Sequence, residues 1–129
     1  HAASAQGVAA AESALGHGNA FTAAIPSAVY TFPEVASVGM TEAEARDAGL
    51  PIAIGRFPIG HLGKAMAARH QEGFVKIIRQ RETGELLGAH MIGHNATECI
   101  SAATALVQNK VSKQLRIRLA SAFICRRGR

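Results

Sequence analysis

Cysteine and histidine are the residue types of this 129-residue chain best suited to nucleophilic, redox or metal chemistry. Cys99 and Cys125 lie 26 positions apart, which matches neither a CxxC pair nor any other short redox or zinc spacing. Cys99 falls on the inner face of a predicted helix, where a cysteine acts as a small hydrophobic residue. We therefore interpret both cysteines as ordinary thiols, and the residues by themselves identify no catalytic group.

Four histidines suggest a metal cluster at first sight: His61, His70, His90 and His94. His90 and His94, however, flank the end of a predicted strand rather than sharing one face of a helix. No cysteine pair accompanies them to complete a zinc-like ligand set. We therefore predict no metal site in this chain.

Basic residues gather at the carboxy terminus. Residues 110–129 carry seven of the 14 lysines and arginines and no acid, whereas residues 1–109 hold the other seven and all nine acids. The formal charge of +5 is thus a property of the tail and not of the slightly acidic body. A tail that binds nucleic acid or another acidic surface is the alternative function, although Phe123 is its one aromatic residue for base stacking. Heparin retention that is lost on deletion from Lys110 would support this alternative.

Composition and length favour one soluble, cytoplasmic domain with a thin core. Apolar residues make up 48% of the chain, aromatic residues only 5%, and tryptophan is absent. Aliphatic side chains and close alanine packing must therefore build the core, which would gain from a partner surface. No stretch approaches the roughly 20 apolar residues of a membrane span, and no charged and then apolar leader opens the chain. The chain opens on His1 directly before a predicted helix, so we expect it to be part of a longer polypeptide.

The elements that would position these residues can be predicted from local signals. We expect a helix over residues 2–15, β-strands over 25–32 and 35–40, a short helix after residue 41 and a strand over 52–59. Pro33 separates the first two strands because proline cannot donate to a central ladder. Thr41 and Glu44 have the spacing of a capping box, and Gly49 provides a left-handed end to the short helix.

The second half of the chain predicts a hairpin and a longer helix. We expect an irregular or briefly helical segment over 60–70, hairpin strands over 73–81 and 86–93, and a helix from Asn95 to about Gln108. Gly84 suits the positive φ of the hairpin loop, and Asn95 is a favoured helix cap. The apolar stripe of the helix comprises Cys99, Ile100, Ala103, Leu106 and Val107. This order predicts an α+β fold, a mostly antiparallel sheet with helices packed on one face.

Several segments carry a family resemblance in their order along the chain. They read IPSAVYTFPEVASVGMTE at 25–42, GFVKII at 73–78, TGELLGAHMIG at 83–93 and HNATECISAATAL at 94–106. Together they resemble the dimerisation domain of the pyridine nucleotide-disulfide oxidoreductases over about 85 residues, far more than an isolated motif. Within that family, the segment from residue 83 to residue 100 is most similar to the dihydrolipoamide dehydrogenases.

This resemblance implies a parent enzyme that oxidises dihydrolipoamide through a redox disulfide, FAD and NAD. The segment HAASAQGVAAAE at 1–12 resembles the place where such chains return to the flavin domain, with a helix amino terminus directed at the flavin. His1 and Ala2 would then be the cofactor-binding residues. The chain has no GxGxxG fingerprint, so we expect neither FAD nor NAD on this chain alone. A yellow sample would contradict that expectation.

The family's catalytic run is missing. The dimerisation domain normally carries His-Pro-Thr-x-x-Glu near its carboxy terminus, where the histidine acts as the acid-base partner of a thiol across the subunit interface. After Val111 the sequence SKQLRIRLASAFICRRGR contains no histidine, proline or glutamate. We hypothesise that the tail differs in origin from the body, through a shifted reading frame, a truncation or an engineered junction, and we expect the chain alone to be inactive.

The resulting domain prediction has three parts. Residues 1–22 form a helix and linker that resemble the end of a flavin domain, residues 23–109 form the dimerisation domain, and residues 110–129 form the basic tail. The expected partners are a second copy of the chain, the FAD and NAD domains of the parent and components of a 2-oxoacid dehydrogenase complex. We expect the isolated chain to self-associate or to be poorly soluble, because a monomer would expose apolar surface.

Overall fold

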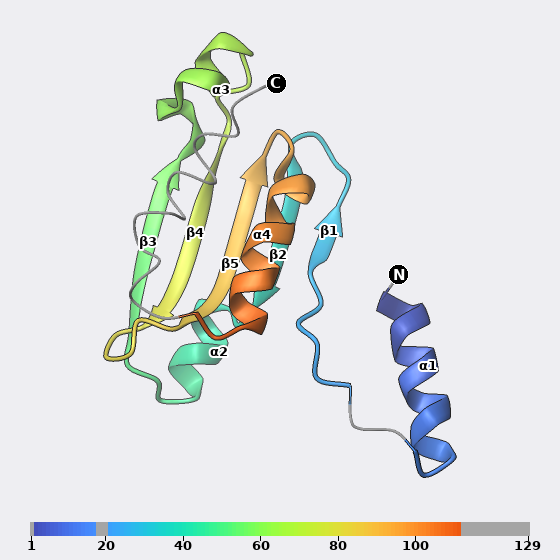
Figure 1. The fold of residues 1–129 in the computed structure, drawn as a ribbon. Helices are drawn as coiled ribbons and strands as arrows, with labels where there is room; N and C mark the ends of the chain where they lie inside the picture. The colour runs from blue at the N-terminus through green and yellow to red at the C-terminus, as the bar shows by residue number, and fades with distance from the viewer. Residues whose placement is uncertain (1, 18–20, 112–129) are drawn as a thin grey trace.

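The computed structural model describes residues 2–17 and 21–111, which contain five strands, four α-helices and one 3-10 turn (Figure 1). In chain order they are α1 (Ala2–Ala14), β1 (Ser27–Val29), β2 (Glu34–Gly39), α2 (Glu42–Asp47), β3 (Ile52–Pro58), η1 (Ile59–His61), α3 (Gly63–Ala67), β4 (Gly73–Gln80), β5 (Leu86–Gly93) and α4 (Ala96–Gln108). Residues 112–129, which make up most of the predicted basic tail, lie outside the described residues.

The five strands form one sheet in the order β1-β2-β5-β4-β3, and every pairing in it is antiparallel. β4 and β5 form the predicted hairpin, with Gly84 at φ 76° in the loop between them. The expected break at Pro33 separates two neighbouring strands, β1 and β2, which pair with each other. The α+β fold class is therefore confirmed.

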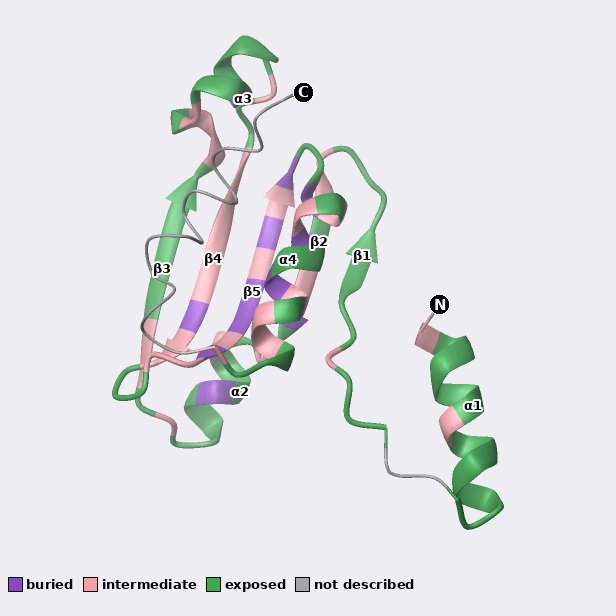
Figure 2. Ribbon diagram, viewed as in Figure 1, coloured by how far each residue is buried: buried purple, intermediate pink, exposed green. Residues whose placement is uncertain are grey.

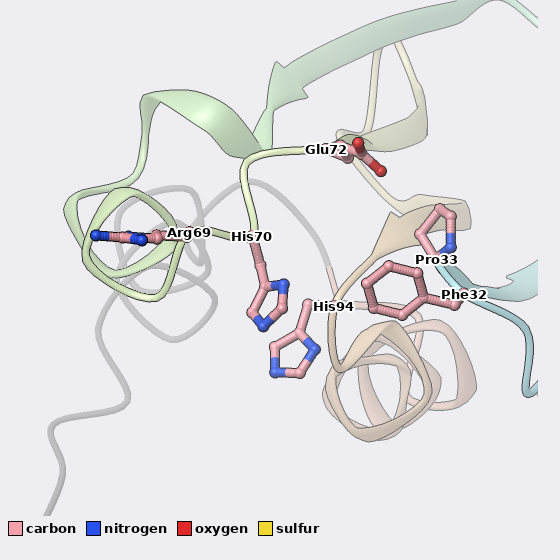
Figure 3. A pocket seen from close by; sticks show the side chains of 6 residues that line it. All are labelled: Phe32, Pro33, Arg69, His70, Glu72 and His94. Carbon is pink, nitrogen blue, oxygen red and sulfur yellow. The ribbon is translucent and has the colours of Figure 1, made fainter.

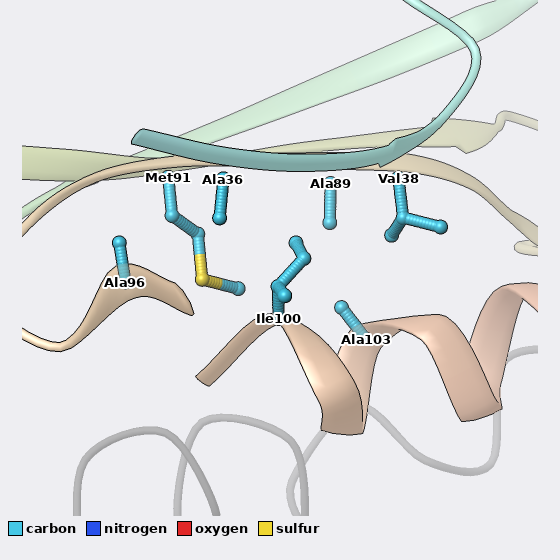
Figure 4. Packing of buried hydrophobic residues seen from close by; sticks show 7 residues of the cluster. All are labelled: Ala36, Val38, Ala89, Met91, Ala96, Ile100 and Ala103. Carbon is cyan, nitrogen blue, oxygen red and sulfur yellow. The ribbon is translucent and has the colours of Figure 1, made fainter. Parts of the chain in front are cut away.

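The main core lies between α4 and the two strands β2 and β5 (Figure 4). Its members are the buried side chains of Ala36, Val38, Ala89, Met91, Ala96, Ile100 and Ala103. Four of the seven are alanines, so the helix can approach the sheet closely and each contact buries little area. The predicted apolar stripe does face the sheet, because Ile100 and Ala103 are fully buried while Cys99 and Val107 pack at the margin.

The capping box is present as predicted. The Thr41 hydroxyl accepts from the Glu44 amide at 3.2 Å, and the Glu44 carboxylate accepts from the Thr41 amide at 2.8 Å. These bonds satisfy donors at the start of α2 that have no partner within the helix. They also hold the pKa of Glu44 below its ordinary value, chiefly through the backbone amide of Thr41.

The cap predicted for α4 is wrong in its mechanism. Asn95 does stand at the N-cap position, but its backbone is left-handed, with φ 60°, and its side chain makes no capping hydrogen bond. Glu34 on β2 takes over this role, because its Oε2 accepts from the Thr97 amide at 3.0 Å and from the Thr97 hydroxyl at 2.8 Å. The helix start is thus tied to a strand 63 residues earlier in the chain.

The amino-terminal helix α1 was predicted correctly and has no buried residue (Figure 2). Its alanine-rich sequence favours a helix through intrinsic propensity, without an apolar face that a sheet could cover. Within residues 2–17 and 21–111, none of the helices combines the length and the apolar character that crossing a bilayer requires.

Candidate interface surface

Large exposed hydrophobic side chains concentrate around β1 and the turn into β2. Tyr30 is 82% exposed and Phe32 is 81% exposed, and Val29 and Val35 beside them are 48% and 38% exposed. We call these four residues the interface patch. Large apolar side chains that lie exposed in one part of a surface are typical of a protein contact.

The patch continues across the face of the sheet that α4 does not cover. Ala36 points into the core, so its neighbour Val35 points to the opposite face. On that face the register places Val29 beside Val35, Val35 beside Ile92, and Ile92 beside Phe74. A row of apolar residues therefore crosses four strands, from β1 to β4.

Charged residues adjoin this row further along β4. Lys76 pairs with Glu42 of α2 at 2.5 Å, and Arg46 reaches the other oxygen of the same carboxylate at 2.5 Å. The hydrogen bond from Lys76 is the main cause that lowers the pKa of Glu42. The Arg56 guanidinium lies 4.4 Å from the centre of the Phe74 ring, within the range of a cation–π contact.

Two of the four histidines that were considered as metal ligands meet at the end of the sheet next to the patch. The His70 and His94 rings stack with their centroids 4.2 Å apart, and Phe32 meets His70 edge-on at 6.1 Å. These three residues, with Pro33, Arg69 and Glu72, line a shallow pocket of about 230 Å³ (Figure 3). The sequence alone does not predict this stack, because the two histidines lie 24 positions apart in different connections.

The other two histidines lie elsewhere. His61 meets Phe57 edge-on, and His90 lies within β5, where its Nε2 is 3.1 Å from the Met40 carbonyl oxygen. His90 therefore lies inside β5. The expectation that it flanks the end of the strand is wrong. Across residues 2–17 and 21–111 there is no group of three or more histidine, cysteine or acidic side chains that could hold a metal ion.

Glu34 interacts with Thr97 of α4 and with the charge of His94. Its pKa is lowered, first by the hydrogen bond from the Thr97 amide, then by the Thr97 hydroxyl, and least by the nearby charge of His94. The carboxylate thus stays ionised at the start of α4, where the helix dipole favours negative charge.

Of the two predicted cofactor-binding residues, His1 lies outside the described residues. Ala2 is the first residue of α1 and is half-buried.

Solved structures share this fold. The HOCl-induced flavoprotein disulfide reductase RclA from Escherichia coli superposes with a TM-score of 0.73 over 84% of this chain and 26% of its own, at 23% identity. LpdA from Mycobacterium tuberculosis superposes with a TM-score of 0.70 over 80% of this chain and 23% of its own, at 28% identity.

The sequence determines the family of this chain. The model of the pyridine nucleotide-disulphide oxidoreductase dimerisation domain matches residues 25–123, and this chain belongs to that family. The dihydrolipoyl dehydrogenase of Chlamydia muridarum is 39% identical over 113 residues, covering 87% of this chain and 24% of the relative. That of Haloferax volcanii is 42% identical over 102 residues, covering 78% and 22%. The chain thus spans about a quarter of the length of these relatives and corresponds to their dimerisation domain.

Proposed function

We propose that this chain forms a homodimer interface through the interface patch and the apolar row beside it. The exposure of Tyr30 and Phe32, at 82% and 81%, is the observation that carries the proposal. Tyrosine and phenylalanine are enriched at protein interfaces because they bury a large area with few rotatable bonds. A second copy is the occupant that the family's dimerisation role favours, and a two-fold axis would bring the same patch from each copy together.

Sedimentation over a range of protein concentrations tests this proposal. We expect the chain to form dimers, and the double variant Tyr30→Ser with Phe32→Ser to weaken association at least about tenfold, since buried aromatic residues are frequent hot spots. Met66→Ser is the matched control, because Met66 is 51% exposed but lies on α3 outside the patch. A wild-type chain that remains monomeric at high concentration would contradict the proposal.

The proposed activity of the complete protein is the oxidation of dihydrolipoyl groups, as the names of the relatives state for those enzymes. FAD in such an enzyme would pass electrons to NAD from the dithiol that forms when dihydrolipoamide reduces the redox disulfide. We propose His1 and Ala2 as flavin-side residues, supported by the family resemblance of residues 1–12 and by the start of α1 at Ala2. The positive end of a helix dipole suits the charge of a reduced flavin.

The remaining parts of the proposal rest on the family resemblance. We propose that residues 1–22 end the flavin domain, that residues 23–109 form the dimerisation domain and that residues 110–129 form a separate tail. The further partners would be the FAD and NAD domains of the parent and components of a 2-oxoacid dehydrogenase complex, in the cytoplasm. Restoring the parent domains together with the family's His-Pro-Thr-x-x-Glu run, and then measuring the oxidation of dihydrolipoamide, tests this part. A restored enzyme that binds flavin but does not oxidise dihydrolipoamide would refute the substrate.

A further inference from the structure

Three connections between elements converge at the histidine pocket. Phe32 lies between β1 and β2, His70 lies between α3 and β4, and His94 lies between β5 and α4. Figure 3 shows the His70 and His94 rings facing each other, with Phe32 beside them. The stack therefore joins segments that are separate in the sequence and that no strand pairing connects directly at those residues.

The backbone holds His70 in place from its own side. The Arg69 amide donates to the Met66 carbonyl at 3.2 Å and the His70 amide donates to the Ala65 carbonyl at 3.0 Å. Arg69 adopts φ 58°, a left-handed conformation that usually falls to glycine at a helix end. Because an L-residue adopts this conformation at a cost, contacts made by the neighbouring segment must help to keep it.

The segment that carries His94 approaches just as closely. A Cβ atom at Gly93 would lie 2.4 Å from Ile59 Cδ1 and 3.1 Å from the Glu72 carbonyl oxygen. Gly93 is thus required where the end of β5 passes the start of β4. This close approach of the two backbone segments positions the two imidazole rings face to face.

The charges around the pair decide what acid does to it. The charge of His94 is the smallest of the causes that lower the pKa of Glu34, so this carboxylate lies within electrostatic reach of the pair. Arg69 and Glu72 also line the pocket, but Figure 3 shows both side chains directed away from the ring pair. A cationic imidazole can still stack on a neutral one, whereas two cations with centroids 4.2 Å apart repel each other.

We propose that the His70–His94 stack is an acid-sensitive latch. Near neutral pH the stacked rings close the α3–β4 connection onto the β5–α4 junction. When both imidazoles carry a proton, repulsion separates them, and the turn around Arg69 loses the contact that helps to keep its left-handed backbone. Histidine is the side chain whose ordinary protonation range lies between about pH 5 and 8, so the latch would open in mildly acidic solution.

Amide hydrogen exchange of the 129-residue chain tests the latch. Between about pH 7.5 and about pH 5, after correction for the intrinsic exchange rate, we expect protection of the Arg69 and His70 amides to fall about tenfold. Protection of the Ala89 amide in the centre of β5 should stay constant. His94→Asn removes one charge of the pair and should abolish the fall at residues 69 and 70.

His61→Asn is the matched control, because His61 stacks on no second histidine in the described chain and meets Phe57 instead. It should behave as the wild type does. His70→Asn is the second variant if His94→Asn does not fold. Its reporter is the Cys99 amide, which donates to the Asn95 carbonyl at the start of α4. Exchange of this amide should depend on acid in the wild type and should not depend on acid in His70→Asn. Equal protection of residues 69 and 70 at both pH values in the wild type, or an undiminished fall in His94→Asn, would overturn the proposal.

Discussion

Glu34 shows how a single residue can link two layers of this domain. It begins β2, yet its carboxylate accepts two hydrogen bonds from Thr97 and so caps α4 from outside the helix. The bond from the Thr97 amide is the first cause that lowers the pKa of Glu34. A carboxylate whose pKa is lower in the folded state stabilises that state above the pKa of the unfolded chain, and the contribution disappears as pH falls through the folded value.

Replacement of Glu34 by glutamine should therefore change the response of the domain to acid. We expect Glu34→Gln to unfold at a lower urea concentration than the wild type at pH 7, and the gap to narrow once the pH falls below the ordinary glutamate pKa of about 4.3. Urea denaturation at both pH values measures this. Glu82→Gln, in the exposed loop between β4 and β5, is the control and should leave the midpoint unchanged. A gap that stays constant with pH would show that the charge of Glu34 plays no part.

Among the elements, α1 and α4 have the same length of 13 residues and differ in what holds them. α4 places Ala96, Ile100 and Ala103 in the core, whereas α1 buries none of its residues in this chain. An isolated helix of this length is marginal in water, because nucleation costs more than so few hydrogen bonds return. The packing of α4 on the sheet therefore stabilises the domain, and α1 contributes little to its stability.

Truncation of one side chain in each helix should expose this difference. Ile100 is 2% exposed at the centre of the core, so Ile100→Ala should cost about 2–5 kcal/mol of unfolding free energy. Val8 is 60% exposed on α1, so Val8→Ala should change it by less than about 0.5 kcal/mol. Chemical denaturation of both variants measures the two values. A comparable loss in both would mean that α1 packs against the domain in solution.

At the scale of the whole molecule, the small core and the exposed patch belong together. Among the described residues, Ile78 and Ile100 are the largest fully buried side chains, while Tyr30 and Phe32 lie open to water. A domain with so little buried area gains stability when a second copy covers its apolar face. This balance is what a member of a dimerisation-domain family requires.

Stability should consequently depend on protein concentration. If association contributes to folding, the thermal midpoint of the wild type should rise across about a hundredfold increase in concentration, because mass action favours the folded dimer. The Tyr30→Ser and Phe32→Ser double variant should show a lower midpoint with a smaller dependence. Differential scanning calorimetry at several concentrations measures both, and a midpoint that does not change with concentration in the wild type would refute the link.

Local signals in the sequence determined most of the secondary structure. The capping box at Thr41 and Glu44, the glycine in the hairpin loop and the apolar stripe of α4 each depend on neighbours within a few residues, so their physics can be read directly from the chain. The ordered family segments also determined the fold class, since they include residues of four of the five strands and of α4.

Only the tertiary structure decided which distant residues meet. The stack of His70 on His94, the cap that Glu34 provides for α4 and the apolar row from Val29 to Phe74 all join residues from different elements. Their contacts depend on strand order and on register. A slip of one residue in the register of a strand would move each of its side chains to the other face. A pattern along the chain carries no record of that order, because antiparallel pairing brings together residues whose separation in sequence is set by the loops and helices between them.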